Sequence, residues 1–312
     1  MYKKIYYADF KDLDNNSIKL EIYKNTDGNV TASELILDSD AITIDYQGDD
    51  DVFYPLKCSG CKVSILTKSL LTDLYTGKAA EVYCKVFRNG SLFWFGYCTP
   101  NIYNSDYIDE YNKLELEFID VISNLDNYNY TYINGAQAIS SFYSIIMHIL
   151  NKLDTEAVIS RVYLHKTKKL NGSFDLLNNM FINERNFFDE DDEAEKCKDV
   201  LEYIASYLGM TLLQFEDKLY FLDYEAIKSN NTALLTYNRT NTNTGNVTIP
   251  QPIVSINENV FEANASISLN DIYNKIVVIG NNNPISDIIP ELFDEDDLIS
   301  QNEDPNKYYI HT

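Results

Sequence analysis

Residues 81–98 read EVYCKVFRNGSLFWFGYC and contain the strongest local structural signal in the chain. Two segments rich in β-branched and aromatic residues, Glu81–Arg88 and Ser91–Cys98, are separated only by Asn89 and Gly90. The Asn-Gly pair tolerates the positive φ angles of a type I′ turn, which joins two antiparallel strands. We therefore predict a β-hairpin over these residues.

Strand patterns continue on both sides of this hairpin. Lys4–Phe10 and Ser17–Lys24 flank a polar turn, and the second segment alternates apolar with polar residues, as a half-buried strand does. Several short strands separated by turn signals are typical of a barrel or a sandwich, so we predict a tube-like β-barrel or sandwich domain over residues 1–128. The further strands expected in it are Glu34–Leu37, Ala41–Tyr46, Val52–Leu56, Cys61–Thr67 and Lys113–Ile122.

The pattern becomes helical after residue 130. Apolar residues at helical spacing predict a helix over residues 136–153, with Asn134 as its N-cap. A second helix is expected over residues 194–208, where Gly209 would end it and the acids of Asp189–Glu195 would lie near its N-terminus. Both helices are amphipathic and each needs a partner surface.

A hairpin pattern follows the second helix directly. Met210–Phe215 and Lys218–Tyr224 are strand-like and flank Glu216 and Asp217, so residues 129–228 are predicted to form an α+β domain. The fold class is therefore mainly β with an α+β insertion.

Residues 229–312 are expected to hold a linker, a partial β region and an acidic tail. Residues 228–250 are rich in Asn and Thr and favour a linker or long loop. The chain has no closing element at its end, and we expect either that it is the front part of a longer polypeptide or that its tail orders on a partner. The strands expected in this region are Ile253–Ile256, Ser266–Leu269 and Lys275–Ile279.

Composition excludes several classes of function. The 312 residues include 48 Asp and Glu against 25 Lys and Arg, a net charge of −23, so the surface repels phosphate backbones and a sequence-reading nucleic-acid binder is disfavoured. No apolar run reaches the length of a membrane span, and the N-terminus lacks a signal-peptide pattern. Five scattered cysteines are typical of a reducing compartment and predict no disulfide framework.

Only one motif suggests metal or redox chemistry. Cys58 and Cys61 form a Cys-x-x-Cys pair, but no second pair or His pair is near in sequence, so we interpret the segment as a turn between strands with apolar cysteines. The remaining candidate ligands are single residues: Cys84, Cys98, Cys197, His148, His165 and His311. We assign no catalytic, cofactor-binding or metal-binding residue.

The acidic runs and the aromatic run can each be interpreted either as a functional site or as an ordinary structural segment. Asp49–Asp51, Asp189–Glu193 and Asp294–Asp297 lack the spacing of a calcium loop or a defined catalytic pair, and are interpreted as solvated segments. The aromatic run Phe93–Tyr97 could stack sugars, or alternate rings could form the core of the hairpin. No phosphate-binding loop, nucleophile elbow or zinc-protease helix is present, which disfavours an enzyme built on a standard motif.

The order of these pieces resembles a known family. Asn89–Tyr97 lies in a β-domain that ends near Leu114–Leu125, and Asp199–Met210 runs from a helix into a hairpin. This arrangement resembles the tail hub or baseplate hub proteins of tailed bacteriophages and their prophage relatives, particularly those of Bacteroides-type phages. The resemblance covers residues 1–225, and the chain departs from it in lacking a recognisable complete second barrel.

The resemblance implies a non-enzymatic structural protein of the virion tail, assembled in the bacterial cytoplasm without cofactors or membrane insertion. Such a subunit would form a homo-oligomeric ring, a trimer or larger, around the DNA conduit. It would join the tail tube or neck to the distal tip or fibres, contact other tail proteins, and let genomic DNA pass without specific binding. The alternatives are a carbohydrate-binding or adhesin-like β module and, less favoured, a glycan-cleaving enzyme with paired acids.

Overall fold

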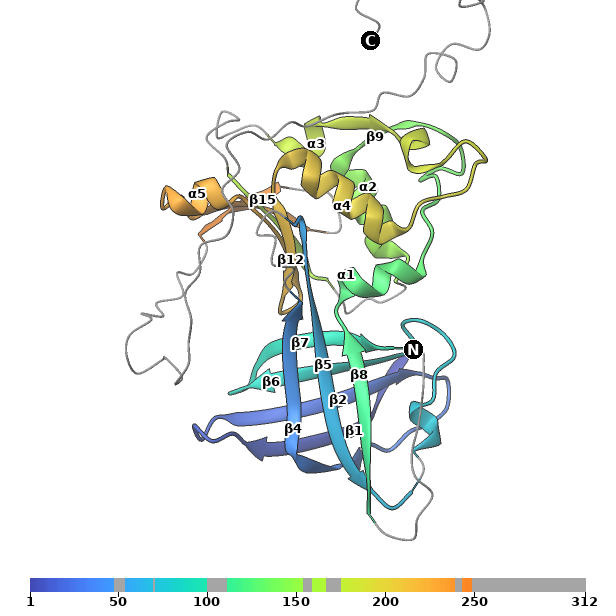
Figure 1. The fold of residues 1–312 in the computed structure, drawn as a ribbon, viewed down its shortest axis with the longest axis vertical. Coiled ribbons are helices and arrows are strands. Elements are labelled where there is room, and N and C mark those ends of the chain that lie inside the picture. Colours follow the sequence, from blue (N-terminus) through green and yellow to red (C-terminus); the bar gives the residue numbers. More distant parts are fainter. Residues whose placement is uncertain are drawn as a thin grey trace, which may run out of the picture. The chain divides into compact units, whose positions relative to one another are not determined.

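The computed structural model describes residues 1–47, 54–69, 71–99, 111–153, 159–166, 175–238 and 243–248 (Figure 1). Met1–Gln251 form one compact unit, and Pro252–Thr312 form a second that lies outside the described residues. The strands predicted beyond residue 250 and the acidic run Asp294–Asp297 therefore lie outside them too. Within the first unit the fold is mainly β with an α+β part, which confirms the predicted fold class.

The strands up to residue 119 form a barrel. β1 pairs with β2, and the sheet continues through β6, β7 and β8 to β5. β5 pairs with β4, and β3, which directly precedes β4, pairs with β1, so the barrel closes on itself. Their bounds are β1 Tyr2–Lys11, β2 Ser17–Asn25, β3 Ser33–Glu34, β4 Ile36–Gln47, β5 Leu56–Thr67, β6 Val82–Arg88, β7 Ser91–Cys98 and β8 Asn112–Ile119.

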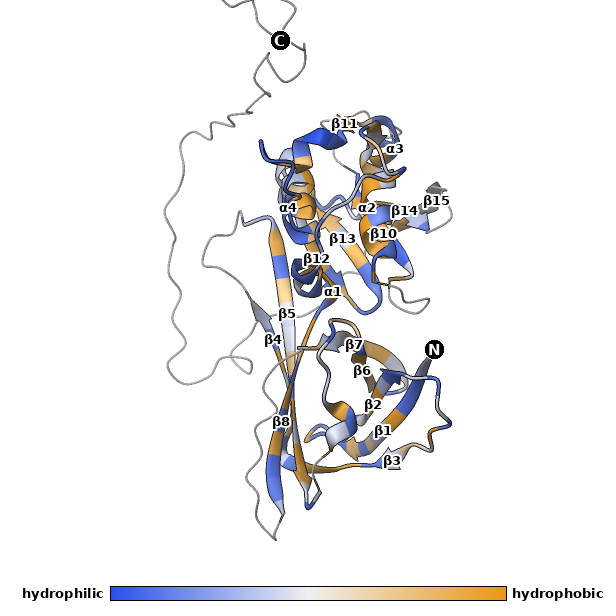
Figure 2. Cartoon of the chain, turned by 90° about the vertical axis from the view of Figure 1, so that its right-hand side faces the viewer, coloured by the Kyte–Doolittle hydropathy of each residue, from blue (hydrophilic) through white to orange (hydrophobic). Residues whose placement is uncertain are grey.

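Both predicted hairpins of the barrel are confirmed. β1 and β2 are antiparallel, and β6 and β7 pair across Asn89 and Gly90. These two turn residues have φ angles of 51° and 82°, the left-handed conformation that the Asn-Gly pair favours. Figure 2 shows hydrophobic and hydrophilic residues alternating along the barrel strands, as expected where one face of a strand is buried.

In the rest of the described chain, α2 and α4 share an apolar cluster with strands of a second part of the sheet. The strand order in that part is β15-β14-β10-β13-β12, and β9 pairs separately with β11. The strands are β9 Ile139–Ser141, β10 Arg161–His165, β11 Phe181–Asn183, β12 Thr211–Phe215, β13 Lys218–Leu222, β14 Ala233–Asn238 and β15 Asn243–Thr248. The α-helices are α1 Val121–Asn124, α2 Phe142–Asn151, α3 Leu176–Asn179, α4 Cys197–Leu208 and α5 Tyr224–Lys228.

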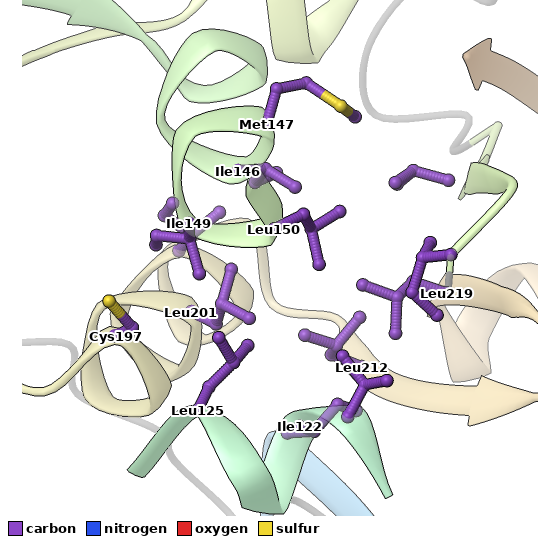
Figure 3. Close-up of a cluster of buried hydrophobic side chains, with 14 of the residues drawn as sticks. Ile122, Leu125, Ile146, Met147, Ile149, Leu150, Cys197, Leu201, Leu212 and Leu219 are labelled. Atoms are coloured by element: carbon purple, nitrogen blue, oxygen red, sulfur yellow. The ribbon is translucent and has the colours of Figure 1, made fainter. Parts of the chain in front are cut away.

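The predicted helix-and-hairpin unit is present. α4 ends at Gly209, which has a φ of 63°, and the Met210 N–H donates 3.0 Å to the Ala205 carbonyl, a pairing that satisfies the helix end. β12 and β13 then form the predicted hairpin over Glu216 and Asp217. Figure 3 shows Ile122, Leu150, Leu201 and Leu212 pointing toward one another from α1, α2, α4 and β12.

The start of the first helix differs from the prediction of residues 136–153. α2 begins at Phe142, and its N-cap is Ser141, whose hydroxyl accepts from the Ser144 N–H at 3.2 Å, rather than Asn134. Residues 139–141 instead form β9, because β11 supplies hydrogen-bonding partners some forty positions further along the chain. α4 likewise begins at Cys197 and not at residue 194.

Two further predictions are wrong. Cys58 to Cys61 lie inside β5 and not in a turn, because β8 and β4 pair with this segment on its two edges. The region expected as a linker contains β14 and β15, because the β14 backbone pairs with β10 in spite of its polar surroundings in sequence. Both errors arise from pairing with strands that are distant in sequence.

Candidate functional site

The two cysteines of the Cys-x-x-Cys segment face opposite sides of β5. Cys58 belongs to the apolar cluster that includes the helices, whereas Cys61 belongs to the cluster that fills the barrel. Residues three apart on a strand point to opposite faces, so these two thiols do not converge on one ligand.

All five cysteines are free and buried. Burial raises the pKa of Cys58 to about 11 and that of Cys98 to about 12, so both remain thiols at neutral pH. In the part of the chain described here, no group of three or more His, Cys, Asp or Glu side chains is arranged to hold a metal ion.

The acidic run Asp189–Glu193 forms an exposed turn before α4. One carboxylate oxygen of Asp189 accepts from the Asp191 N–H at 3.0 Å and from the Glu193 N–H at 2.7 Å. These bonds close the turn on itself, and Arg185 pairs with Asp192 at 3.1 Å. The run is thus a solvated segment near the helix. The run Asp49–Asp51 lies outside the described residues.

The aromatic run is buried on both faces of β7. Trp94 lies in the barrel interior, while Phe95 and Tyr97 pack on the outer face against the helical part, and the three are 3%, 1% and 0% exposed. A sugar platform needs exposed ring faces. The carbohydrate-binding alternative depended on this aromatic run, and the run is explained by the packing of its rings into two apolar cores.

Two buried ionisable side chains, Glu184 and His165, form hydrogen bonds that hold parts of the fold together. Glu184 is fully buried, and its carboxylate accepts from the Tyr130 hydroxyl at 3.0 Å and the Ile133 N–H at 2.9 Å. His165 is also fully buried, with Nε2 2.6 Å from the Asn231 carbonyl and Nδ1 accepting from the Asp223 N–H at 3.4 Å. Glu184 holds the segment after α1 against β11, and His165 holds α5 against β10.

Large apolar side chains are exposed on α4 and on the β9–β11 pair, the strand pair that leads into α2. Tyr203 and Tyr207 lie one turn apart on α4 and are 48% and 68% exposed, and the Tyr207 ring centroid is 5.7 Å from that of Phe142, the first residue of α2. Ile139 and Phe181 lie on the β9–β11 pair and are 71% and 61% exposed. We call Ile139, Phe181, Tyr203 and Tyr207 the α2-end surface.

The register of β9 and β11 explains the exposure of two of these side chains. Phe181 pairs with Ser141, and Ile139 pairs with Asn183, so these residues share one face of the pair. The opposite face carries Ile182, which packs against the apolar core. Sequence periodicity could not identify the β9–β11 part of this surface, because each strand is only three residues long.

The electrostatic surroundings of Tyr203 in the α2-end surface are acidic. Burial raises the pKa of Tyr203, and the neighbouring carboxylates of Glu195, Asp199 and Glu202 raise it further. The tyrosine hydroxyl therefore stays protonated and able to donate. Exposed aromatic side chains on structured elements are common in protein–protein contact surfaces.

No protein-family model matches the chain, and no curated protein matches it. Among solved structures, it is similar to the 43 kDa tail protein of prophage MuSo2 from Shewanella oneidensis, with 12% identity and a TM-score of 0.36 over 58% of this chain and 52% of that one. It is also similar to a tail protein from Neisseria meningitidis MC58, with 14% identity and a TM-score of 0.37 over 59% of this chain and 51% of that one. The matched part therefore spans about half of each of those chains.

Among the described helices, none has both the length and the hydrophobicity needed to cross a lipid bilayer.

Proposed function

We propose that this chain is a structural subunit of a bacteriophage tail, a hub protein that works by assembly and not by catalysis. The observation that carries the proposal is the α2-end surface, where four large apolar side chains are 48–71% exposed on structured elements. Scattered exposed apolar residues are normal, but a group of them on a folded surface indicates a contact with another protein. The hub-like order of Asn89–Tyr97, Leu114–Leu125 and Asp199–Met210 supports the same role.

The use of the buried polar groups supports an assembly role as well. Glu184 and His165 form hydrogen bonds with backbone and side-chain partners inside the fold. A catalytic acid or base must instead reach a substrate proton. We propose that residues 1–128 act as the tube-like domain and that residues 129–228 carry the contact surface.

The partner that we assign to the α2-end surface is a second copy of the chain. In a homo-oligomeric ring of three or more copies, every copy would bury its α2-end surface against a neighbouring copy. The ring would surround the DNA conduit and join the tail tube or neck to the distal tip or fibres. A Bacteroides-type phage or prophage is the proposed source, and the virion tail is the proposed location.

The mass of the purified full chain in solution tests this function. We expect the wild-type chain to form at least a trimer by light scattering coupled to size exclusion. The double variant Tyr203→Ser/Tyr207→Ser should lose most of that assembly, because it removes two exposed rings from the α2-end surface. Leu13→Ser is the matched control, since Leu13 is fully exposed in the β1–β2 turn.

A monomeric wild-type chain at high concentration would contradict the ring. Labelling of purified virions with an antibody against the chain tests the tail location independently. Signal at the tail supports a structural virion component, and signal absent from the particle contradicts it.

A further inference from the structure

One strand belongs to both parts of the compact unit. Cys58–Thr67 of β5 pair with barrel strands, whereas Leu56 and Lys57 pair in parallel with Leu212 and Leu213 of β12. The sheet therefore runs without a break from the barrel into the α+β part. The direct ladder between the two parts contains only these two residue pairs, which is too short to fix their relative position.

A buried carboxylate lies where the two parts meet. Asp120 is fully buried between β8 and α1, and its Oδ2 accepts from the Ser59 N–H at 2.6 Å and the Ser59 hydroxyl at 3.1 Å. Its Oδ1 accepts from the Ser123 N–H at 2.8 Å and so caps α1. The Trp94 indole N–H completes the network by donating 3.0 Å to the Ser59 hydroxyl. The carboxylate thus connects β5 to α1, and the Ser59 hydroxyl extends the network to β7.

A second buried side chain reaches from the α+β sheet to the barrel. Gln214 of β12 is 5% exposed, and its amide nitrogen donates to the Phe95 carbonyl of β7 at 2.8 Å. Its amide oxygen accepts from the Val121 N–H of α1 at 2.8 Å. Ser59, Trp94, Asp120 and Gln214 together form what we call the junction network.

We propose that the junction network fixes the barrel and the α+β part as one rigid, cooperatively folding body. Apolar contact also spans the two parts, since Phe95 and Tyr97 share a cluster with Leu212. Hydrophobic attraction is non-directional, so it favours contact without selecting one orientation. Hydrogen bonds are directional, and a buried polar group that is left without a partner destabilises the folded state. The network therefore selects a single arrangement of the two parts. A subunit that holds its neighbours in a fixed geometry needs such a connection.

Trp94 makes the inference testable in the native chain. It is the only tryptophan, so its fluorescence reports the barrel side of the junction. The described α-helices all follow residue 120, so helical circular dichroism reports the other side. In urea, the two signals of the wild-type full chain should change at the same midpoint, as expected of two-state unfolding.

Gln214→Leu removes the three hydrogen bonds of the side-chain amide, with Phe95, Val121 and Glu216, at nearly constant volume. We expect the two transitions to separate in this variant, with helical signal lost at lower urea than the Trp94 signal. Tyr130→Phe is the matched control, because it removes one buried hydrogen bond, to Glu184, away from the junction. Its transitions should shift together. Coincident transitions in Gln214→Leu, or separate transitions in the wild type, would overturn the proposal.

Native-state hydrogen exchange on the unmutated chain gives a second measurement that needs no variant. The best-protected amides of β6 and β13 should share one opening reaction, with protection within about threefold of each other. Protection that differs by tenfold or more would show two independently opening bodies and contradict the inference.

Discussion

The indole N–H of Trp94 donates a 3.0 Å hydrogen bond to the hydroxyl of Ser59, and this contact joins β7 to β5 inside the barrel. It is possible because Gly96, two residues further on the same face of β7, has no side chain. A Cβ atom at Gly96 would overlap both the Trp94 ring and the Ile119 carbonyl oxygen. The position of the only tryptophan therefore depends on a glycine.

Gly96→Ala is expected to lower the free energy of unfolding by about 1–3 kcal/mol, because the ring or the β8 backbone must move to admit a methyl group. The emission maximum of Trp94 should shift in the same variant. Gly77→Ala is the control, since a Cβ there meets no atom within 4 Å. Unchanged emission and stability in Gly96→Ala would contradict the packing described.

Ile204 lies on the buried face of α4 and is 2% exposed. Ile204→Asp would place a charge in the core between α4 and the sheet, at a cost of about 3 kcal/mol or more. We expect loss of soluble protein or a large fall in melting temperature. Ser206→Asp, at an exposed position on the same helix, should have little effect. A soluble Ile204→Asp chain with unchanged melting temperature would show that this face is not core.

Glu21 makes the stability of the folded chain depend on pH. Burial alone would raise its pKa, but hydrogen bonds from Lys19, Tyr23 and Lys4 outweigh burial and lower the pKa from 4.5 to about 2. The unfolded chain thus binds a proton at higher pH than the folded chain. The stabilisation is complete above pH 4.5 and is lost as the pH falls toward 2.

Glu21→Gln should therefore flatten the fall in stability over that pH range and lower stability at neutral pH by about 1.5–3 kcal/mol, the usual value of hydrogen bonds to a charged group. Urea unfolding at a series of pH values measures both effects. Glu34→Gln, which changes an exposed carboxyl on β3, is the control. An unaltered pH slope in Glu21→Gln would refute the assignment.

Cys58 and Cys61 are expected to act independently. Cys58→Ala and Cys61→Ala should each lower stability by about 1 kcal/mol through lost packing. Because the two thiols lie in different clusters, the double variant should be additive within about 0.5 kcal/mol. A large coupling energy, or stoichiometric metal that disappears in the double variant, would show that the pair binds a shared ligand.

The chain should not retain DNA. With a net charge of −23, any duplex near its surface is repelled, and an acidic wall around a conduit would let DNA pass without a salt-dependent grip. We expect no gel retardation of duplex DNA even at about 50 mM salt, where a basic patch would act most strongly. Micromolar binding under these conditions would refute the conduit role and leave the structural role open.

Local chemistry was sufficient to predict the elements whose signals lie within a few residues of one another. Asn89 and Gly90 determine the β6–β7 turn through their positive φ angles, and Gly209 ends α4 for the same reason. The alternating pattern of β2 and the helical period of α4 specify which faces are buried. These features need no knowledge of distant parts of the chain.

Only the tertiary structure decided the features that depend on distant partners. The Cys58–Cys61 segment is a strand because β8 and β4 pair with it, and residues 139–141 form β9 because β11 lies beside them. The α2-end surface and the junction network have the same origin. Hydrogen bonds and apolar contacts between remote segments override local preference, since a backbone group inside the protein must find a partner wherever the fold supplies one.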